Sequence, residues 1–407
     1  MSLSQGRAYL AIPGPSVMPD VVLQAMHRPS PNIYEGELHD LTASLIPDLK
    51  AVAMTQHHVA IYIGNGHAAW EAALVNVLSP DDKVLVPATG RFGLGWGEMA
   101  ADLGAEVEII DHGARSAIDP DKVAAALKAD KAHKIKAVLA VHVDTSTSVK
   151  SDIAALRKAM DATGHPALLV VDCIASLGCD RFEMDEWGVD VMVSACQKGL
   201  MTPAGISFVW FNDKADALQP QQVSRYWNWR PRKSPDIYYQ YFCGTAPTHH
   251  LYGLRAALDL IKAEGLEHVF DRHAILAQAI WTACDAWARG GDLQLNVETP
   301  AQRSHAVTSV AMASPDGDRL RQYCEHQCGL TLGIGLGRNP ADAFFRIGHM
   351  GHVSAQMIMG ALGTIQVGLN ALDIPAGDGA LEAAAKVIAS AELAKPAGVC
   401  GASGDCC

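Results

Sequence analysis

Three features of the sequence could do chemistry together, and a lysine is central to them. Lys198 follows an apolar run and precedes Gly199. Partial burial there would lower its pKa and leave a neutral amine that can form an imine with a carbonyl. Asp172 ends the apolar run 168–171, and open α/β sheets bind ligands at the C-terminal ends of their strands. The segment Gly64-Asn65-Gly66-His67 lies between another apolar run and an expected helix. The free backbone N–H groups at the start of that helix could bind a phosphate.

Each feature also has an ordinary structural explanation. Lys198 could be a surface turn lysine, Asp172 a helix cap, and the Asn65-Gly66 segment a plain strand-to-helix turn. The combination favours chemistry, because pyridoxal phosphate (PLP) needs a phosphate cradle, an acid near its ring nitrogen and an imine-forming lysine. The residues therefore predict a PLP site in which Lys198 anchors the cofactor and then moves the substrate proton.

These residues must be positioned by the elements around them. Short apolar runs without strict alternation are expected as strands buried on both faces, at 59–63, 84–87, 137–141, 168–172, 189–193 and 206–210. The spacing of Trp70, Ala73, Leu74 and Val77 predicts an amphipathic helix. Ser151 is expected to cap another helix, which would run to about Thr163. The alternation of strands and helices predicts an α/β fold with a mostly parallel sheet sandwiched by helices.

Four parts of the chain are expected. Residues 1–20 are punctuated by Pro and Gly and are predicted to form an N-terminal arm. Residues 21–261 would form a large PLP-binding domain, and 262–390 a smaller α+β C-terminal domain. Residues 391–407 are small, polar and cysteine-rich, and are expected to form a disordered tail. Within the large domain, 225–241 is dense in aromatics, Arg and Pro, and predicts a long ordered loop.

Composition excludes several classes of function. The net charge of −12 and the lack of a basic stripe argue against nucleic-acid binding. No apolar run reaches the roughly 20 residues that cross a bilayer. With no secretory signal at the start either, a cytoplasmic protein is expected. The ten cysteines match no zinc spacing, so we predict no metal and expect buried thiols in a reducing compartment.

The sequence resembles the class V aminotransferases of fold type I, in the alanine/serine-glyoxylate aminotransferase group. The resemblance covers roughly residues 10–375 and rests on the motifs Ile12-Pro13-Gly14-Pro15, Gly64-Asn65-Gly66-His67, Val171-Asp172, Gln197-Lys198-Gly199 and Phe345-Arg346-Ile347-Gly348-His349-Met350-Gly351. It implies a seven-stranded type of sheet in the large domain. It also implies a homodimer with active sites at the subunit interface.

The resemblance further implies a role for each matching residue. Positions that match cofactor contacts are Asn65, Gly66, His67, Phe92, Thr145, Asp172, Gln197, Lys198 and Thr245. Lys198 would carry the Schiff base, Asp172 would pair with the pyridinium nitrogen, and Phe92 would stack on the ring. Arg346 would grip the substrate α-carboxylate, a task that suits its rigid fork. Thr245 would reach the phosphate of the partner subunit.

Two further residues are implied at the substrate. Gly14, in the Pro13-Gly14-Pro15 arm, would border it. Many bacterial relatives have a His-Arg pair where this chain has Pro31-Asn32-Ile33-Tyr34-Glu35, so Tyr34 could recognise a different side chain. Relatives also have a tyrosine at the position of Phe242. Because phenylalanine has no hydroxyl group, this chain is expected to lack one hydrogen bond to phosphate.

The resulting hypothesis is a ping-pong aminotransferase that moves an amino group from serine or alanine to glyoxylate or pyruvate. Aspartate is a second possible donor if Arg225, Arg230 or Arg232 binds another carboxylate, although surface charge or dimer contacts are the simpler explanation of those three. Two competing hypotheses are a lyase or desulfurase of the same fold and a non-enzymatic α/β protein that has lost PLP or uses it only for sensing.

Overall fold

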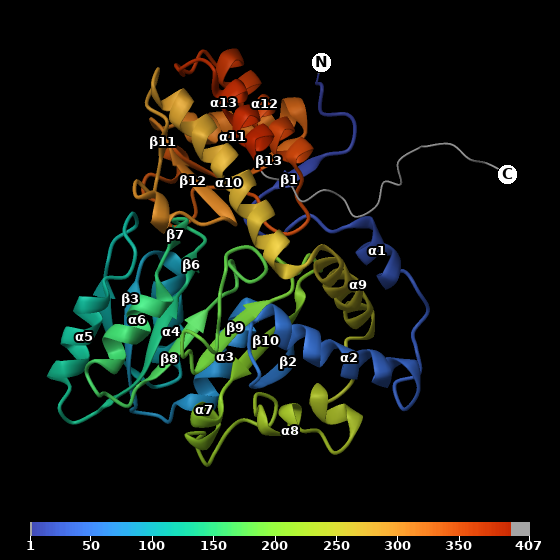
Figure 1. Cartoon of the computed structure of the whole chain (residues 1–407), viewed down its shortest axis with the longest axis vertical. Coiled ribbons are helices and arrows are strands. Elements are labelled where there is room, and N and C mark those ends of the chain that lie inside the picture. Colours follow the sequence, from blue (N-terminus) through green and yellow to red (C-terminus); the bar gives the residue numbers. More distant parts are fainter. Residues whose placement is uncertain (1, 392–407) are drawn as a thin grey trace, which may run out of the picture.

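Figure 1 shows the computed structural model, which describes residues 2–391, as two bodies stacked along the long axis of the molecule. The large body is a seven-stranded sheet with helices on both faces, in the strand order β2-β10-β9-β8-β5-β3-β4. Strand β10 is antiparallel to both of its neighbours, and the other pairs are parallel. The predicted mostly parallel sheet is confirmed. Its strands are β2 (His58–Gly64), β3 (Lys83–Ala88), β4 (Glu106–Asp111), β5 (Ile135–Val141), β8 (Leu168–Asp172), β9 (Val191–Ala195) and β10 (Gly205–Phe211).

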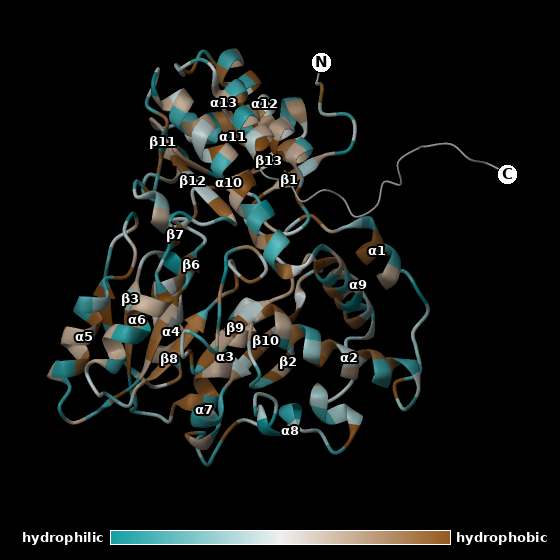
Figure 2. Cartoon of the chain, in the orientation of Figure 1, coloured by the Kyte–Doolittle hydropathy of each residue, from teal (hydrophilic) through white to brown (hydrophobic). Residues whose placement is uncertain are grey.

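The two faces of this sheet have separate apolar cores. Leu168 and Val170 pack with α3 and α4, whereas Leu169 and Val171 pack on the other face with α2, α5, α6 and α9. Both faces of β8 are buried, which explains its unbroken apolar sequence. In Figure 2 the strands at the centre are largely brown, and teal is concentrated on the outer helices. The helices of the large body are α1 (Asp20–Met26), α2 (Glu37–Val52), α3 (Gly66–Val77), α4 (Arg91–Asp102), α5 (Pro120–Ala129), α6 (Ile153–Asp161), α7 (Asp213–Ala217), α8 (Arg230–Lys233), α9 (Thr248–Glu264) and the 3₁₀ turn η1 (Tyr238–Tyr241).

The small body is a five-stranded sheet in the order β1-β13-β14-β12-β11. Its strands are β1 (Tyr9–Ala11), β11 (Gln294–Leu295), β12 (Val307–Ala311), β13 (Leu330–Ile334) and β14 (Phe344–Gly348), and its helices are α10 (Leu266–Ala288), α11 (Asp316–Cys328), α12 (Ala355–Ala371) and α13 (Ala380–Ser390), with the 3₁₀ turns η2 (Pro300–Gln302) and η3 (Ala341–Ala343). At the border between the bodies lies a short hairpin, β6 (Val143–Asp144) and β7 (Val149–Lys150).

Sequence reasoning erred at several elements. It missed β4, an edge strand whose Glu106 and Glu108 interrupt the apolar pattern. The strand expected at 189–193 starts two residues too early, because β9 begins only after Asp190. The expected Ser151 cap is wrong: Asp152 caps α6 by accepting from the Ala155 N–H at 2.8 Å. The Ser151 hydroxyl instead accepts from the Ile118 N–H.

The predicted arm, 1–20, is partly a strand, since β1 pairs in parallel with β13. The domain boundary at 261/262 stays a prediction, although it lies just before α10, whose buried residues join the small-body core. Nearly all of the predicted tail, 392–407, lies outside the described residues. Across residues 2–391, no helix has the length and apolar character needed to cross a membrane.

Candidate active site

A cavity of about 270 Å³ opens where β8 and β9 end and α3 begins. The sequence-predicted residues that line it are Gly14, Asn65, Gly66, His67, Phe92, Thr145, Asp172, Gln197 and Lys198. Its other lining residues are Pro15, Trp70, Val143, Ile174, Ala175 and Ala204. The sheet therefore brings together residues that are separated by up to 184 positions in the chain.

Lys198 lies three residues after β9 and is only 9% exposed. Burial, with the positive charge of Arg346 adding to it, lowers the pKa of Lys198 to about 8, while the Asp172 carboxylate acts in the opposite direction. The ammonium donates to the carbonyl of Pro13. The chain leaves little room here: a Cβ at Gly14 would lie 2.5–2.6 Å from the end of the lysine side chain. The amine is thus buried, positioned and easily made neutral, which are the properties that imine formation requires.

Asp172 ends β8 on the floor of the same cavity and is 3% exposed. Its Oδ1 accepts from the Ile174 N–H at 2.6 Å, and its Oδ2 from the Trp70 indole N–H at 2.9 Å. Burial raises the pKa of Asp172 to about 7, and the two hydrogen bonds oppose that rise. A carboxylate held in this way can pair with a cationic ring nitrogen.

The Asn65-Gly66-His67 turn forms the first residues of α3. The Asn65 side chain caps the helix by accepting from the His67 N–H at 3.1 Å. A Cβ at Gly66 would lie 2.5 Å from the end of the Ile174 side chain, so a larger residue here would have to displace Ile174, which also lines the cavity. The helix N-terminus brings free N–H groups and a positive dipole end to this point.

Gln197 completes this end of the cavity. Its buried amide oxygen has no hydrogen-bond partner in the part of the chain that the structure describes. An amide flip exchanges its oxygen and nitrogen, so Gln197 can present its NH₂ group to an anion. Together with the open space at Gly66, this orphaned amide shows that the residues present fit a bound phosphate.

Arg346 comes from β14 of the small body and lies beside the cavity, although it is not among the lining residues. Its Nε donates to the carbonyl of Ile334 at 2.7 Å and its Nη1 to the carbonyl of Thr145, a cavity residue, at 2.8 Å. Within residues 2–391, Nη2 makes no hydrogen bond to protein. Burial lowers the pKa of Arg346 to about 10, and the Asp144 carboxylate opposes this shift. The guanidinium thus stays charged near neutral pH and keeps a donor for an anion.

Known proteins resemble this chain over nearly its whole length. The family model for class V aminotransferases matches residues 8–354. A serine--glyoxylate aminotransferase from Methylorubrum extorquens is 37% identical over 96% of this chain and 98% of its own length. An L-aspartate--glyoxylate aminotransferase from Paracoccus denitrificans is 35% identical over 92% of this chain and 94% of its own length. The crystal structure of pyridoxamine-pyruvate aminotransferase from Mesorhizobium loti is 26% identical, with a TM-score of 0.87 over 96% of this chain and 99% of the other.

The chain belongs to the class V aminotransferase family. It is therefore a transaminase, and membership implies PLP as the cofactor and amino acids and oxo acids as substrates.

Two residues of this class V enzyme matter more to the site than sequence reasoning recognised. Helical spacing assigns Trp70 only to an apolar helix face, yet its indole N–H binds Asp172. Asp144 is fully buried and accepts from the N–H groups of Phe92, Gly93 and Ser146. It thereby ties the turn that carries Phe92 to the β6–β7 hairpin. An acid three residues after the apolar run 137–141 was the available signal for Asp144.

Two predicted site residues lie away from the cavity of this class V enzyme. Tyr34, between α1 and α2, is 85% exposed. Thr245, just before α9, is also exposed. Neither is among the lining residues of the cavity within its own subunit. Their predicted roles depend on a second copy of the chain and stay predictions.

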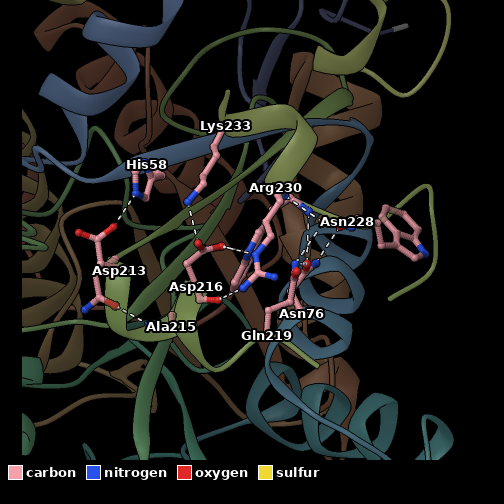
Figure 3. Close-up of polar contacts among 12 residues, drawn as sticks. His58, Asn76, Asp213, Ala215, Asp216, Gln219, Asn228, Arg230 and Lys233 are labelled. Carbon is pink, nitrogen blue, oxygen red and sulfur yellow. Dashed lines mark hydrogen bonds and ion pairs between the residues drawn. The ribbon is translucent and has the colours of Figure 1, made fainter. Parts of the chain in front are cut away.

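The three arginines considered for a dicarboxylate substrate have other partners. Figure 3 shows Arg230 and Lys233 pointing at Asp216. The Arg230 Nε and the Lys233 Nζ lie 3.2 and 2.7 Å from the Asp216 carboxylate. Arg232 is buried and donates to the carbonyls of Ile61, Tyr241 and Tyr226. Arg225 donates to the Tyr239 hydroxyl. These contacts fasten the 225–241 loop to the large body, and none of the three arginines is among the lining residues of the described cavity.

Proposed function

We propose that this enzyme transfers an amino group from serine or alanine to glyoxylate or pyruvate in two half-reactions, with PLP bound through Lys198. The observation that carries the proposal is the buried lysine, whose lowered pKa and position beside Asp172 suit a covalently bound carbonyl cofactor. The identity of 37% to a serine--glyoxylate aminotransferase over nearly the whole chain supports the choice of substrates.

The polar and aromatic residues of the cavity have separate tasks in this proposal. PLP supplies an electron sink once it is bound. The Asp172 carboxylate pairs with the ring nitrogen, and the α3 N-terminus, with Gln197, holds the phosphate. Phe92 provides an apolar ring face on one side of the cavity. The neutral Lys198 amine accepts the proton from the Cα of the donor. In the second half-reaction it donates a proton to the Cα of the amino acid that is formed.

Arg346 and the Gly14 arm complete the site on the substrate side. The free Nη2 of Arg346 donates to the α-carboxylate of the donor and, in the second half-reaction, of the acceptor. A single carboxylate-binding arginine suits both substrates in turn, as a ping-pong mechanism requires. The Pro13-Gly14 arm lies so close to Lys198 that a Cβ at residue 14 would clash with the lysine side chain, and this closeness limits the space for the substrate side chain and favours a small donor.

A panel of amino acids tests the proposal. Each is mixed with the PLP-loaded enzyme, and conversion of the visible band of the lysine-bound cofactor to the pyridoxamine form is followed. We expect serine or alanine to give the highest kcat/KM with glyoxylate as acceptor, and parallel lines in double-reciprocal plots. The substrate assignment fails if aspartate surpasses both.

Aspartate is the second candidate donor, because a relative at 35% identity is named an L-aspartate--glyoxylate aminotransferase. Desulfuration is disfavoured, since the lining residues of the described cavity include no cysteine. Cys324 is buried in α11, and burial raises its pKa to about 12. Such a thiol is a poor nucleophile near neutral pH.

We also propose that the enzyme works as a homodimer in the cytoplasm. Exposed apolar side chains, namely Val21, Leu23, Tyr34, Ile237 and Tyr239, lie in segments near α1, α2 and η1, where a second copy could cover them. Light scattering should give about twice 43.3 kDa; a mass of one chain would refute the dimer. The cytoplasmic location is supported by the unpaired state of all cysteines within residues 2–391.

A further inference from the structure

A buried carboxylate outside the cavity connects the large and small bodies. Asp180 lies in the turns after β8, and its side chain is 0% exposed. On the small-body side it accepts from the Ser304 hydroxyl at 2.7 Å and from the His305 N–H at 2.9 Å. On the large-body side it pairs with Lys150 of β7 at 3.3 Å. An isolated buried carboxylate would be very costly, so this one depends on all of these partners.

The surroundings keep Asp180 ionised. Burial alone would raise its pKa, but Lys150, His305 and His142, together with the His305 N–H, outweigh burial and lower the pKa to about 2. A small apolar cluster packs around these polar contacts. Its members come from both bodies and are Val143, Ala175, Cys179, Ala306, Val307 and Met350. The charge is therefore permanent near neutral pH and shielded from water.

The first path from Asp180 to Arg346 runs through the small-body sheet. His305 comes two residues before β12, and its carbonyl accepts from the His349 ring at 2.9 Å. The His349 N–H in turn donates to the Ala306 carbonyl at 2.9 Å. Strand β12 pairs with β14 in a register that places Ser309 opposite Arg346. Holding the start of β12 thus holds the strand that carries Arg346.

The second path runs through the β6–β7 hairpin. Lys150, which pairs with Asp180, lies at the end of β7. The loop between the two strands contains Thr145, whose carbonyl accepts from Arg346 Nη1 at 2.8 Å. The strand that carries Arg346 and the hairpin that accepts from its Nη1 are therefore both connected to a single carboxylate, while Ile334 of β13 accepts from its Nε. Figure 1 shows this hairpin at the border directly below β12.

We propose that Asp180 is a positioning residue that holds the small body against the β6–β7 hairpin and thereby sets the place of Arg346 for the substrate carboxylate. This inference rests on the proposed role of Arg346 in substrate binding. Asp180 does not line the cavity, so its loss should weaken substrate binding while PLP binding stays intact.

The test compares Asp180→Asn with a matched control, Asp190→Asn. Asp190 is another buried carboxylate, 3% exposed, but it bonds only within the large body, to the Leu169 N–H and to Asn212, Lys214 and Arg157. Asp180→Asn removes the negative charge that pairs with Lys150 and turns one of the two accepting oxygens into a donor, so the ionic part of the connection between the bodies is lost. Readouts are KM for donor and acceptor, Ki for propionate as an unreactive carboxylate, PLP affinity and thermal stability.

We expect Asp180→Asn to raise both KM values and the propionate Ki by about 10-fold or more, in step, because small misplacements of binding groups cost this much. PLP affinity should stay at the wild-type value. Asp190→Asn should lower thermal stability and leave KM and Ki unchanged. Equal KM and Ki in Asp180→Asn and wild type would overturn the inference, as would a parallel loss of PLP affinity.

Two further variants keep the outcome interpretable. Ser304→Ala removes one hydrogen bond to Asp180 and keeps the charge. It should raise KM and the propionate Ki above the wild-type values, and it tests the inference even if Asp180→Asn does not fold. Unchanged KM and Ki in Ser304→Ala would then refute the inference. Arg346→Lys separates the two proposals. If it keeps the wild-type Ki for propionate, the substrate role of Arg346 is wrong. If it weakens propionate binding and Asp180→Asn does not, only the positioning role fails.

Discussion

The hydrogen bond from Trp70 to Asp172 allows a sharp test of how the cofactor ring is held. Trp70→Phe keeps a buried ring but removes the indole N–H that lies 2.9 Å from Oδ2. A hydrogen bond to a charged group contributes about 1.5–3 kcal/mol. At about 1.4 kcal/mol per tenfold change, PLP affinity should fall by roughly 10- to 100-fold. The variant also loses one of the two bonds that oppose the effect of burial, so the pKa of Asp172 should rise further.

The pH dependence adds a second signature to this prediction. Burial raises the pKa of Asp172 to about 7, and PLP pairs with the ionised form. Raising the pH above the Asp172 pKa ionises this carboxyl group in the wild type and in Trp70→Phe. The part of the loss in PLP affinity that arises from protonation of Asp172 should therefore shrink. Affinity is measured by equilibrium dialysis of the cofactor-free protein against PLP across this range.

Trp96→Phe is the matched control for the same measurement. Trp96 is fully buried and stacks on Trp70 with a centroid distance of 5.7 Å, but its indole nitrogen has no hydrogen-bond partner in the described structure. Its replacement changes packing without removing a bond to Asp172. If Trp70→Phe binds PLP no more weakly than Trp96→Phe does, the hydrogen bond does not support the cofactor and the reasoning fails.

Three more predictions concern the lysine and the phosphate end of the cavity. Because burial lowers the pKa of Lys198 to about 8, the rate at which added PLP develops its visible band should rise with pH and level off above that value; a rate that still climbs at the ordinary lysine pKa would contradict this. Gly14→Ala should weaken the band, because its Cβ would lie 2.5 Å from Lys198 and the lysine side chain would have to move. Gly379→Ala, also at positive φ but with open space around it, should leave the band unchanged. Equal bands in both variants would refute the importance of this close contact. Asn65→Ala should lower unfolding free energy by about 1 kcal/mol through loss of the α3 cap, and Asn65→Ser should nearly restore it in denaturant titrations; equal midpoints for all three proteins would refute the role of the cap.

Much of the site could be predicted because its residues follow strands. Asp172 and Lys198 come after buried runs, and parallel strands carry such residues to one edge of a sheet. Trp70 could not be assigned in this way, because helical spacing makes any apolar residue look like core, and its single polar atom reveals itself only when the partner is seen. Asp180 lies in irregular turns, and its partners come from both bodies.

In the fold, too, local sequence predicts individual strands but does not predict pairing between residues that are far apart in the chain. The inner strands consist mostly of apolar residues, so the sequence predicts them to within about two residues, but β4 at the edge carries alternating charges. Strand β1 has only three residues, and its partner β13 is about 320 positions away. No local pattern encodes that pairing, which is why the Pro- and Gly-rich start predicts an arm and not a strand. Tyr34 and Thr245 remain exposed in the single chain, so their roles depend on assembly.

The central claim is that Lys198 binds PLP covalently. The most direct measurement is to load the purified enzyme with PLP, reduce it with borohydride, and map the modified peptide by mass spectrometry. We predict one pyridoxyl group per chain, on Lys198, and none in Lys198→Ala treated in the same way. A label on another lysine, or an equal label in Lys198→Ala, would contradict the account.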